Sequence, residues 1–496
     1  MVAGELEQVS AHPSREPRKL VMVEPNTAST ISARIDRLPS SRPLWSWVAR
    51  ISFGAFFEVY ETALTSLIAP LLIQVGIFHK GRGGLFGLPD LATFGFATFF
   101  GLFVGALLFS VVADRLGRRP IFTYSLIWYA LATLFMAFQS DAVSVCLWRF
   151  IAAVGVGAEI VAVDSYISEM TPKAMRGRGF AISKAIQYTA IPIAAILATV
   201  LARRTVAGLD GWRIMLFVPI IGAIFIWWVR RGLPESPRWL AEHGRAGEAQ
   251  AILDHIENRI ILRTSRPLPP IELPDVVPVS QGGFVDLFRG QLLQRTLMLT
   301  VVSCAITIAY FGFSNWLPSL LEARGTGLTK SLAYTALIAL SYPVLPFLFS
   351  FIADRFERKW QICAGAALTA VAGLLFVGQT HVAGWLACSL VITVGNNLAG
   401  YSSHTYRSEL FPTSLRARGI GLVYSIDRLA AAFNSYLIGF ILVQAGVSGV
   451  LTFISAVSVV AIFVIALFGP RTRGLATEAI HNRTGEYRLR SPRVDA

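Results

Sequence analysis

Apolar stretches of about twenty residues recur along this chain, and each is long enough to cross the ~30 Å hydrocarbon core of a membrane as a helix. The sequence predicts twelve such spans, at residues 44–73, 91–113, 120–139, 143–168, 178–202, 212–230, 294–321, 331–353, 359–378, 383–408, 418–443 and 449–469. With 54% hydrophobic and only 15% charged residues, the chain has more apolar surface than a soluble fold can bury. We therefore expect an all-α protein that lies in the lipid bilayer.

The formal net charge is +14, and most of the Lys and Arg residues that produce it lie on one side of the predicted membrane spans. With the N-terminus placed in the cytoplasm and the ends of each span counted with the adjoining loop, seven of the 44 Lys and Arg residues lie outside and 34 lie on the inner side. The other three, Arg149, Lys184 and Arg428, lie well within spans. This asymmetry is the positive-inside bias of membrane proteins. The charge therefore predicts a topology with both termini cytoplasmic, and it does not indicate a nucleic-acid partner. Residues 1–43 lack the features of a signal peptide.

Two motifs recur at a constant spacing. SVVADRLGRR, which contains Asp114, returns as SFIADRFERK, which contains Asp354, 240 positions later. YISEMTPKAMRGRG from Tyr166 returns in the same register as YRSELFPTSLRARG from Tyr406. Such a repeat indicates two homologous halves related by an axis along the membrane normal. The expected domains are a cytoplasmic tail at 1–43, a six-helix bundle at 44–230, a cytoplasmic linker with a short helix at 231–290, a second six-helix bundle at 294–469 and a cytoplasmic tail at 470–496.

The first repeated motif resembles the Asp-Arg-x-Gly-Arg-Arg signature of the major facilitator superfamily. The PESPRWL run from Pro234 and the Glu-x-x-Pro-x-x-x-Arg-x-Arg-Gly pattern from Glu169 and Glu409 are similar to its sugar-porter-like branch, which includes organic-ion and synaptic-vesicle-glycoprotein-like members. The resemblance implies the major facilitator fold, with twelve transmembrane helices in two six-helix bundles. It also implies alternating access, in which the bundles rock around a central substrate site.

Other stretches narrow the resemblance within this branch. Gly469-Pro470-Arg471-Thr472 stands where sugar porters carry Pro-Glu-Thr, so a hexose substrate is less favoured. RIDRLPSSR from Arg34 and FFEVYETAL from Phe56 look most like bacterial metabolite transporters of the niacin, aromatic-acid and sugar-acid kind.

Acidic and basic residues cluster on the expected cytoplasmic face. They are Asp114, Arg115, Arg118, Glu169, Arg176 and Glu235 in the first half, and Asp354, Arg355, Arg358, Glu409 and Arg416 in the second. We predict that ion pairs among them close a cytoplasmic gate. An exposed pair contributes only ~0–1 kcal/mol, so a network would be needed to bias two conformations. The alternative is that the basic residues anchor the topology and the acids are solvated.

Ionisable residues within spans cost ~2.5–3.5 kcal/mol each to insert, so each is a candidate for function. Glu58 and Glu61 are three positions apart on the first span and share one helix face. Desolvation and mutual repulsion favour their protonated forms, so we predict that they carry protons. Contact with a cationic substrate and a structural salt bridge are the alternatives. Glu159 in the fourth span is the third candidate for proton coupling, with a structural role as its alternative.

Arg149 and Arg428 are candidate contacts for an anionic substrate, with structural pairing as the alternative for each. Asp427 precedes Arg428 but points about 100° away around the helix, and we assign it to the site too. Lys184 is expected to extend to the cytoplasmic surface. The other predicted substrate-binding residues are polar or aromatic side chains within spans: Gln187, Tyr188, Tyr310, Asn315, Trp316, Asn396, Asn397 and Asn434.

The sequence contains no Gly-x-Ser-x-Gly, His-Glu-x-x-His or Gly-Lys-Ser/Thr motif, so we predict no enzyme, no cofactor and no ATP-driven pump. The four scattered Cys residues predict neither disulfides nor a metal site. The leading hypothesis is proton-coupled uptake of a small organic anion, such as an aromatic, nicotinate-like or sugar acid, by a monomer in the cytoplasmic (inner) membrane. The alternatives are a neutral sugar or polyol porter, a drug:proton antiporter and a transporter-like metabolite sensor.

Overall fold

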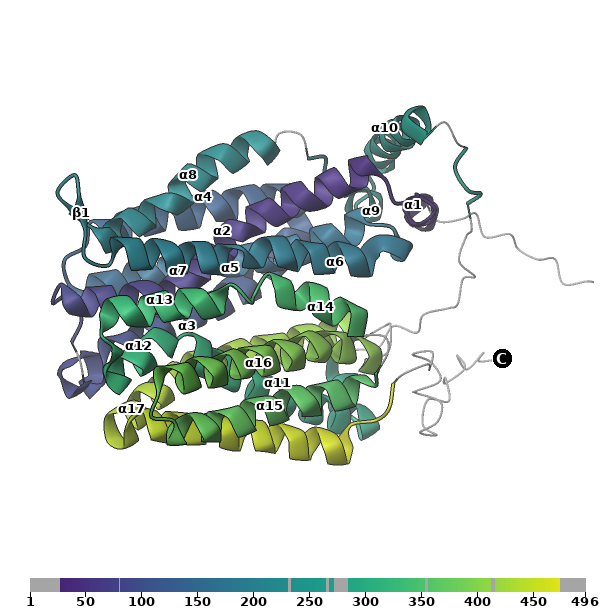
Figure 1. Ribbon diagram of the computed structural model, residues 1–496. Coiled ribbons are helices and arrows are strands. Elements are labelled where there is room, and N and C mark those ends of the chain that lie inside the picture. Colours follow the sequence, from purple (N-terminus) through teal and green to yellow (C-terminus); the bar gives the residue numbers. More distant parts are fainter. Residues whose placement is uncertain are drawn as a thin grey trace, which may run out of the picture.

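The computed structural model describes residues 27–79, 81–230, 233–264, 267–271, 284–352, 356–411 and 415–472. Long helices run side by side, with those of the first half above those of the second in Figure 1. The strands in the described part are β1 (Thr205–Val206) and β2 (Leu209–Asp210), which form a short antiparallel hairpin between two helices. The expectation of an all-α fold is confirmed.

The first half of the chain contributes six spans. They are formed by α2 (Arg42–Gln74), α3 (Asp90–Leu116), α4 (Arg118–Ala137), α5 (Ala142–Met170), α6 (Lys173–Tyr188) with α7 (Ala190–Leu201), and α8 (Gly211–Arg230). The 3-10 helices η1 (Gly81–Gly83) and η2 (Leu85–Gly87) lie between α2 and α3.

The second half repeats the arrangement. Its spans are formed by α11 (Gly290–Ser314) with α12 (Leu317–Leu321), α13 (Leu328–Ala339) with α14 (Val344–Ile352), α15 (Arg358–Gly378), α16 (Val382–Leu410) and α17 (Arg416–Phe468). The last of these contains two spans, because the backbone of Gly446 leaves the helical region (φ 63°, ψ −162°) where the chain turns back. The 3-10 helix η3 (Phe284–Phe288) precedes α11, and η4 (Glu322–Thr326) follows α12. The twelve predicted spans are confirmed.

Three spans are broken by proline. The helices α6, α11 and α13 end at Tyr188, Ser314 and Ala339, which precede Pro192, Pro318 and Pro343 by four residues. A proline has no N–H to donate to the carbonyl four residues earlier, so the regular hydrogen-bond ladder stops there. Discontinuous helices of this kind place polar backbone and side chains at membrane depth in transporters.

Helices α3 and α5 pack with their backbones in close contact. A Cβ atom added to Gly105 would lie 2.1 Å from the backbone oxygen of Val154, and one added to Gly157 would lie 2.4 Å from the backbone oxygen of Leu102. Only glycine fits at these two positions. Small residues at helix crossings are typical of membrane bundles, and here they bring the polar side chains of α5 close to α3.

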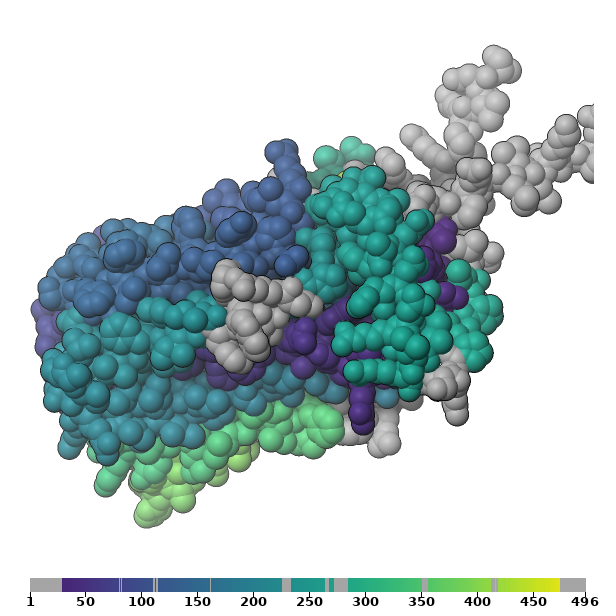
Figure 2. Space-filling model, turned by 90° about the horizontal axis from the view of Figure 1, so that it is seen from above, coloured from purple at the N-terminus to yellow at the C-terminus, as the bar shows by residue number. Residues whose placement is uncertain are grey.

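One end of the molecule, here named the basic face, carries α1 (Thr27–Asp36), α9 (Pro237–Glu242) and α10 (Ala246–Thr264), as Figures 1 and 2 show. Arg34 of α1 lies 2.5 Å from Asp254 and 2.9 Å from Glu257 of α10, and Arg37 lies 2.8 Å from Glu257. Burial opposes ionisation of Glu257, but the hydrogen bonds from Arg34 and Arg37 outweigh it and hold the pKa of Glu257 below its ordinary value. The pairs fasten α1 to the linker helix α10.

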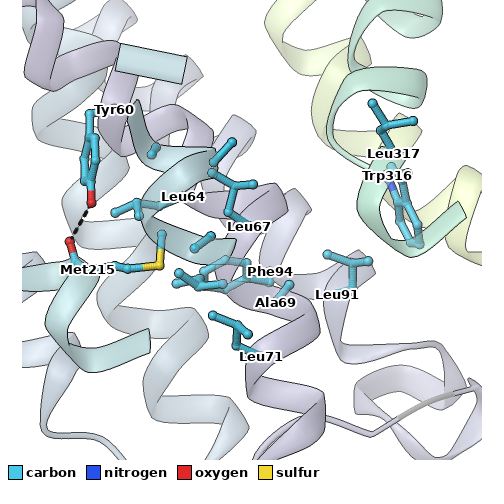
Figure 3. Packing of buried hydrophobic residues seen from close by; sticks show 14 of the residues in the cluster. Tyr60, Leu64, Leu67, Ala69, Leu71, Leu91, Phe94, Met215, Trp316 and Leu317 are labelled. Atoms are coloured by element: carbon cyan, nitrogen blue, oxygen red, sulfur yellow. Dashed lines mark hydrogen bonds between the residues drawn. The ribbon is translucent and has the colours of Figure 1, made fainter. Parts of the chain in front are cut away.

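Apolar side chains join the two halves away from the basic face. The largest buried cluster combines Leu64, Leu67 and Phe94 of the first half with Trp316 and Leu317 of the second, and Figure 3 shows part of it. Two further clusters lie toward the basic face, and each is confined to one half of the chain. The two bundles therefore share their apolar packing on the opposite side of the molecule, the side of η1, η2 and the β1–β2 hairpin.

Candidate functional site

Arg149 of α5 lies inside the first bundle, against α2 and α3. Its Nη1 lies 2.8 Å from Glu61 Oε2, and its Nη2 donates to the backbone oxygen of Glu61 (2.5 Å) and to Thr65 Oγ1 (2.8 Å). Its Nε donates to Thr98 Oγ1 at 3.0 Å. The two charged side chains are 1% and 0% exposed, so the pair is fully buried. This geometry matches the structural-pair alternative for Arg149, and a substrate contact by Arg149 stays a prediction that would require Glu61 to release it.

Glu58 lies on the same helix as Glu61 but in a different environment. It is buried, and no hydrogen bond or salt bridge within the described residues reaches its carboxylate. The charged groups close enough to act on it are Lys184, Glu159, Asp164 and, from the second half, Arg428. Glu58 therefore faces the boundary between the two halves, whereas Glu61 is held inside the first half.

Lys184 of α6 is 36% exposed and forms a salt bridge with Asp164, which is 48% exposed. Its Nζ lies 3.5 Å from Asp164 Oδ1 of α5 and 3.2 Å from Gln187 Oε1. Gln187 in turn donates to Ser183 Oγ, which also accepts a hydrogen bond from Ser52 Oγ of α2, each at 2.8 Å. A neighbouring carboxylate thus supplies the counter-charge of Lys184.

Asp427 of α17 forms a buried pair with Arg407 of α16. Arg407 Nη1 lies 3.3 Å from Asp427 Oδ2, and Ser303 Oγ of α11 donates to the same oxygen at 2.8 Å. Sequence reasoning missed Arg407, because it stands at the end of a predicted span and was counted among the loop cations. The repeat carried a signal: Arg407 replaces Ile167, an apolar and fully buried residue of the first half.

Arg428 of α17 has aromatic neighbours. It donates to the hydroxyl of Tyr424, its Cζ lies 4.6 Å from the centroid of the Tyr424 ring, and it lies 5.6 Å from the ring of Phe311 in α11. Within the described residues no carboxylate forms a salt bridge with it, although the charges of its neighbour Asp427 and, more weakly, of Glu58 in the other half act on it. Arg428 is thus a cation at membrane depth whose contacts are neutral.

Tyrosines from three spans meet close to Arg428. The ring of Tyr342 packs edge-on against Tyr188 (6.2 Å between centroids) and Tyr310 (6.5 Å), and Tyr310 packs against Phe311 (4.9 Å). Tyr188 and Tyr310 were predicted site residues, whereas Tyr342 was missed. The signal for Tyr342 is the Tyr-Pro dipeptide in a span, which places it at the break between α13 and α14.

The predicted asparagines lie in the second half, and three of them form hydrogen bonds there. Asn396 Oδ1 accepts from Thr369 (3.1 Å), and Asn397 and Asn434 donate to backbone oxygens at 2.8 and 3.2 Å. Asn315 is the C-cap residue that follows α11, and Trp316 lies in the apolar cluster that joins the halves. Their role in substrate binding stays a prediction.

The predicted gate residues form matching pairs in the two halves. Arg118 Nε lies 3.1 Å from Glu169 Oε1, and Arg358 Nε lies 3.4 Å from Glu409 Oε1, at positions related by the 240-residue repeat. Each pair lies within one half. Glu235 accepts hydrogen bonds from the backbone N–H groups of Arg118 (3.1 Å) and of the next residue, which start α4, so its carboxylate caps that helix.

The remaining gate residues are less fully described. Arg176 lies 3.6 Å from Asp36 of α1, and Arg115 is exposed. Asp354 and Arg355, together with the side chains of Asp114 and Arg416, lie outside the described residues. The gate as a whole stays a prediction.

The sequence from residue 47 to 483 matches the model of the family described as sugar (and other) transporter. The chain belongs to this family. It is 32% identical over 447 residues to the putative metabolite transport protein YyaJ of Bacillus subtilis (strain 168), covering 90% of this chain and 96% of that protein. It is 25% identical over 454 residues to the niacin transporter NiaP of Acinetobacter baylyi, covering 90% and 99%. As a member of this family, the protein is a multi-pass membrane transporter and not an enzyme.

Solved structures confirm the fold of this family member. XylE, described as a proton:xylose symporter of the major facilitator superfamily, matches with a TM-score of 0.66 and 18% identity, over 89% of this chain and 98% of that one. The inward open form of XylE from E. coli matches with a TM-score of 0.68 and 18% identity, over 89% and 99%. The major facilitator fold predicted from the repeated motifs is confirmed.

Proposed function

We propose that the protein is a proton-coupled symporter that takes up a small organic anion by alternating access. The observation that carries this proposal is the environment of Arg428. Arg149, Lys184 and Arg407 have carboxylate partners at 2.8, 3.5 and 3.3 Å, whereas Arg428 has none among the described residues. A charge at membrane depth is costly without a counter-charge. The carboxylate of a substrate would supply it.

Proton coupling follows from the position of Glu58 across from Arg428. The two side chains belong to opposite halves, and each lies close enough for its charge to act on the other. An anion bound to Arg428 adds a negative charge near Glu58, and this repulsion is relieved when Glu58 takes up a proton. Binding of the anion and of the proton therefore favour each other, and this linkage is reciprocal.

Glu61 and Glu159 complete the proposed coupling group. Protonation of Glu61 would weaken its ion pair with Arg149 and so loosen the contact between α2 and α5. The first bundle would then have two arrangements, one with this contact tight and one with it loosened. Glu159 is fully buried on α5 and close enough to act on the charge of Glu58. Both carboxylates would respond to the same proton.

The substrate class is an aromatic, nicotinate-like or sugar acid. The rings of Tyr188, Tyr310 and Tyr342 offer flat apolar surfaces and hydroxyl groups beside Arg428. Niacin, the substrate in the printed name of one relative, belongs to this class. We further propose that the basic face is cytoplasmic, with both termini inside, in the inner membrane, and that the protein acts as a monomer. The pairs Arg118–Glu169 and Arg358–Glu409 then lie beside the cytoplasmic gate.

The test is uptake of labelled nicotinate, benzoate, gluconate and glucose into proteoliposomes, with an inward proton gradient and with the gradient collapsed by an ionophore. We expect one of the acids to accumulate, the accumulation to vanish with the ionophore, and Arg428→Gln to abolish it. Arg289→Gln is the matched control, because Arg289 is 74% exposed on the linker side of α11. Accumulation of glucose alone, or accumulation that ignores the ionophore, would overturn the proposal.

A further inference from the structure

At three positions of the 240-residue repeat, the second half carries a charged residue where the first half carries an uncharged one. The 240-residue repeat places Ile167, Gln187 and Tyr188 of the first half in register with Arg407, Asp427 and Arg428 of the second. All three residues are uncharged in the first half and all three are charged in the second. The three charges are therefore a feature of the second half and not a requirement of the repeated fold.

The structure places these charges in two different environments. Arg407 and Asp427 pair at 3.3 Å and are 6% and 4% exposed, with Ser303 donating to the same carboxylate oxygen. Asp427 and Arg428 are consecutive, so their side chains point about 100° apart around α17. Asp427 thus faces α16 and α11, while Arg428 faces Tyr424, Phe311 and, across the boundary of the halves, Glu58.

Packing alone does not explain the buried pair. Burying an ion pair gives little or no stability compared with well-packed apolar residues, because both ions lose their hydration. The first half has Ile167 and Gln187 at the equivalent positions, and both are fully buried without carrying a charge. The pair does, however, change the charge at the substrate site. Asp427 without Arg407 would be a buried carboxylate beside Arg428, and it would cancel the charge that an anion needs.

We propose that Arg407 is a specificity-determining residue that acts through Asp427. By holding the carboxylate of Asp427, it keeps the charge of Arg428 available for an anionic substrate. The three residues together carry one net positive charge, and loss of Arg407 reduces this to zero. The inference rests on the proposed contact between Arg428 and the substrate, and it adds a positioning pair behind that contact.

The experiment measures dissociation constants on the folded, monodisperse fraction of each variant of the full chain in detergent. The probe is the acid among nicotinate, benzoate and gluconate that the wild type accumulates. The variants are Arg407→Gln, Asp427→Asn, the double variant and Arg428→Gln. We expect Arg407→Gln to weaken binding roughly tenfold or more, since it leaves an uncompensated buried carboxylate. The double variant, which keeps one net positive charge at Arg428, should recover binding to within about threefold of the wild type.

The outcomes separate this inference from a role in stability and from the proposed function. A pair that only stabilises the fold would lower the yield of Arg407→Gln and leave the dissociation constant of its folded fraction unchanged, which overturns the inference. If Arg407→Gln does not fold, a double variant that binds the acid as weakly as Arg428→Gln overturns it as well. Wild-type affinity in Arg428→Gln contradicts the proposed function itself. If Arg428→Gln loses binding and Arg407→Gln keeps the wild-type affinity, only the role of Arg407 is contradicted.

Discussion

Arg149 and Glu61 form an ion pair inside the first bundle, with 2.8 Å between Nη1 and Oε2 and almost no exposed surface. The same guanidinium also binds the hydroxyl groups of Thr65 and Thr98, so it connects α5 to α2 and α3. A buried pair of this kind has an asymmetric energetic effect. Removal of one partner is strongly destabilising because the other charge stays buried, whereas removal of both charges is far less costly.

We therefore predict that Arg149→Leu lowers the free energy of unfolding by about 3–5 kcal/mol. Arg149→Leu combined with Glu61→Leu should be clearly more stable than Arg149→Leu alone. Thermal unfolding in detergent, followed by tryptophan fluorescence, measures both. Equal stability of the single and double variants would show that the carboxylate of Glu61 is already neutral in the resting protein.

The second prediction concerns Glu58 and the pH dependence of binding. A negatively charged Glu58 repels an anion on Arg428, so affinity for the acid should fall as the pH rises, by at most about tenfold per pH unit for one linked proton. Glu58→Gln removes this repulsion, and its affinity should stay constant with pH. Titration of the acid at several pH values measures the effect. If Glu58→Gln keeps the full pH dependence and Glu61→Gln loses it, the linked proton resides on Glu61.

The contact between α1 and α10 should depend on acid pH. The pKa of Glu257 in the folded protein is lowered by Arg34 and Arg37, so the stabilisation is present above the unfolded pKa of about 4.3 and is lost as the pH falls through the lowered value. We predict that spin labels on α1 and α10 stay at a fixed distance at neutral pH and separate only in strong acid. Glu257→Gln removes two of the three ion pairs, so it should raise the fraction of separated labels at neutral pH above that of the wild type. Separation of the wild type already at pH 6 would show that another group controls the contact.

The sequence predicted the fold well because its signals are long and repeated. Twelve apolar stretches and a register of 240 residues fix the number of spans and the two halves before any contact is known. The site was predicted less completely, because single residues carry no such redundancy. Arg407 looked like a loop cation, since hydropathy does not locate the end of a helix to within one turn. Tyr342 resembled any packing aromatic, since its neighbours Tyr188 and Tyr310 come from other spans.

The ring and the hydroxyl of Tyr342 can be tested separately. Tyr342→Phe keeps the edge contacts with Tyr188 and Tyr310, whereas Tyr342→Ala removes them and opens the break between α13 and α14. An aromatic pair contributes about 0.5–1.5 kcal/mol beyond its buried area, so loss of one contact between the ring of Tyr342 and a ring-bearing acid should weaken binding by roughly two- to tenfold. We therefore predict that Tyr342→Ala reduces the affinity for nicotinate or benzoate and affects gluconate much less. Tyr342→Phe should stay near the wild type for the aromatic acids. The reverse pattern, in which Tyr342→Phe loses gluconate and Tyr342→Ala retains benzoate, would show that the hydroxyl binds a sugar acid and that the rings only pack the helices.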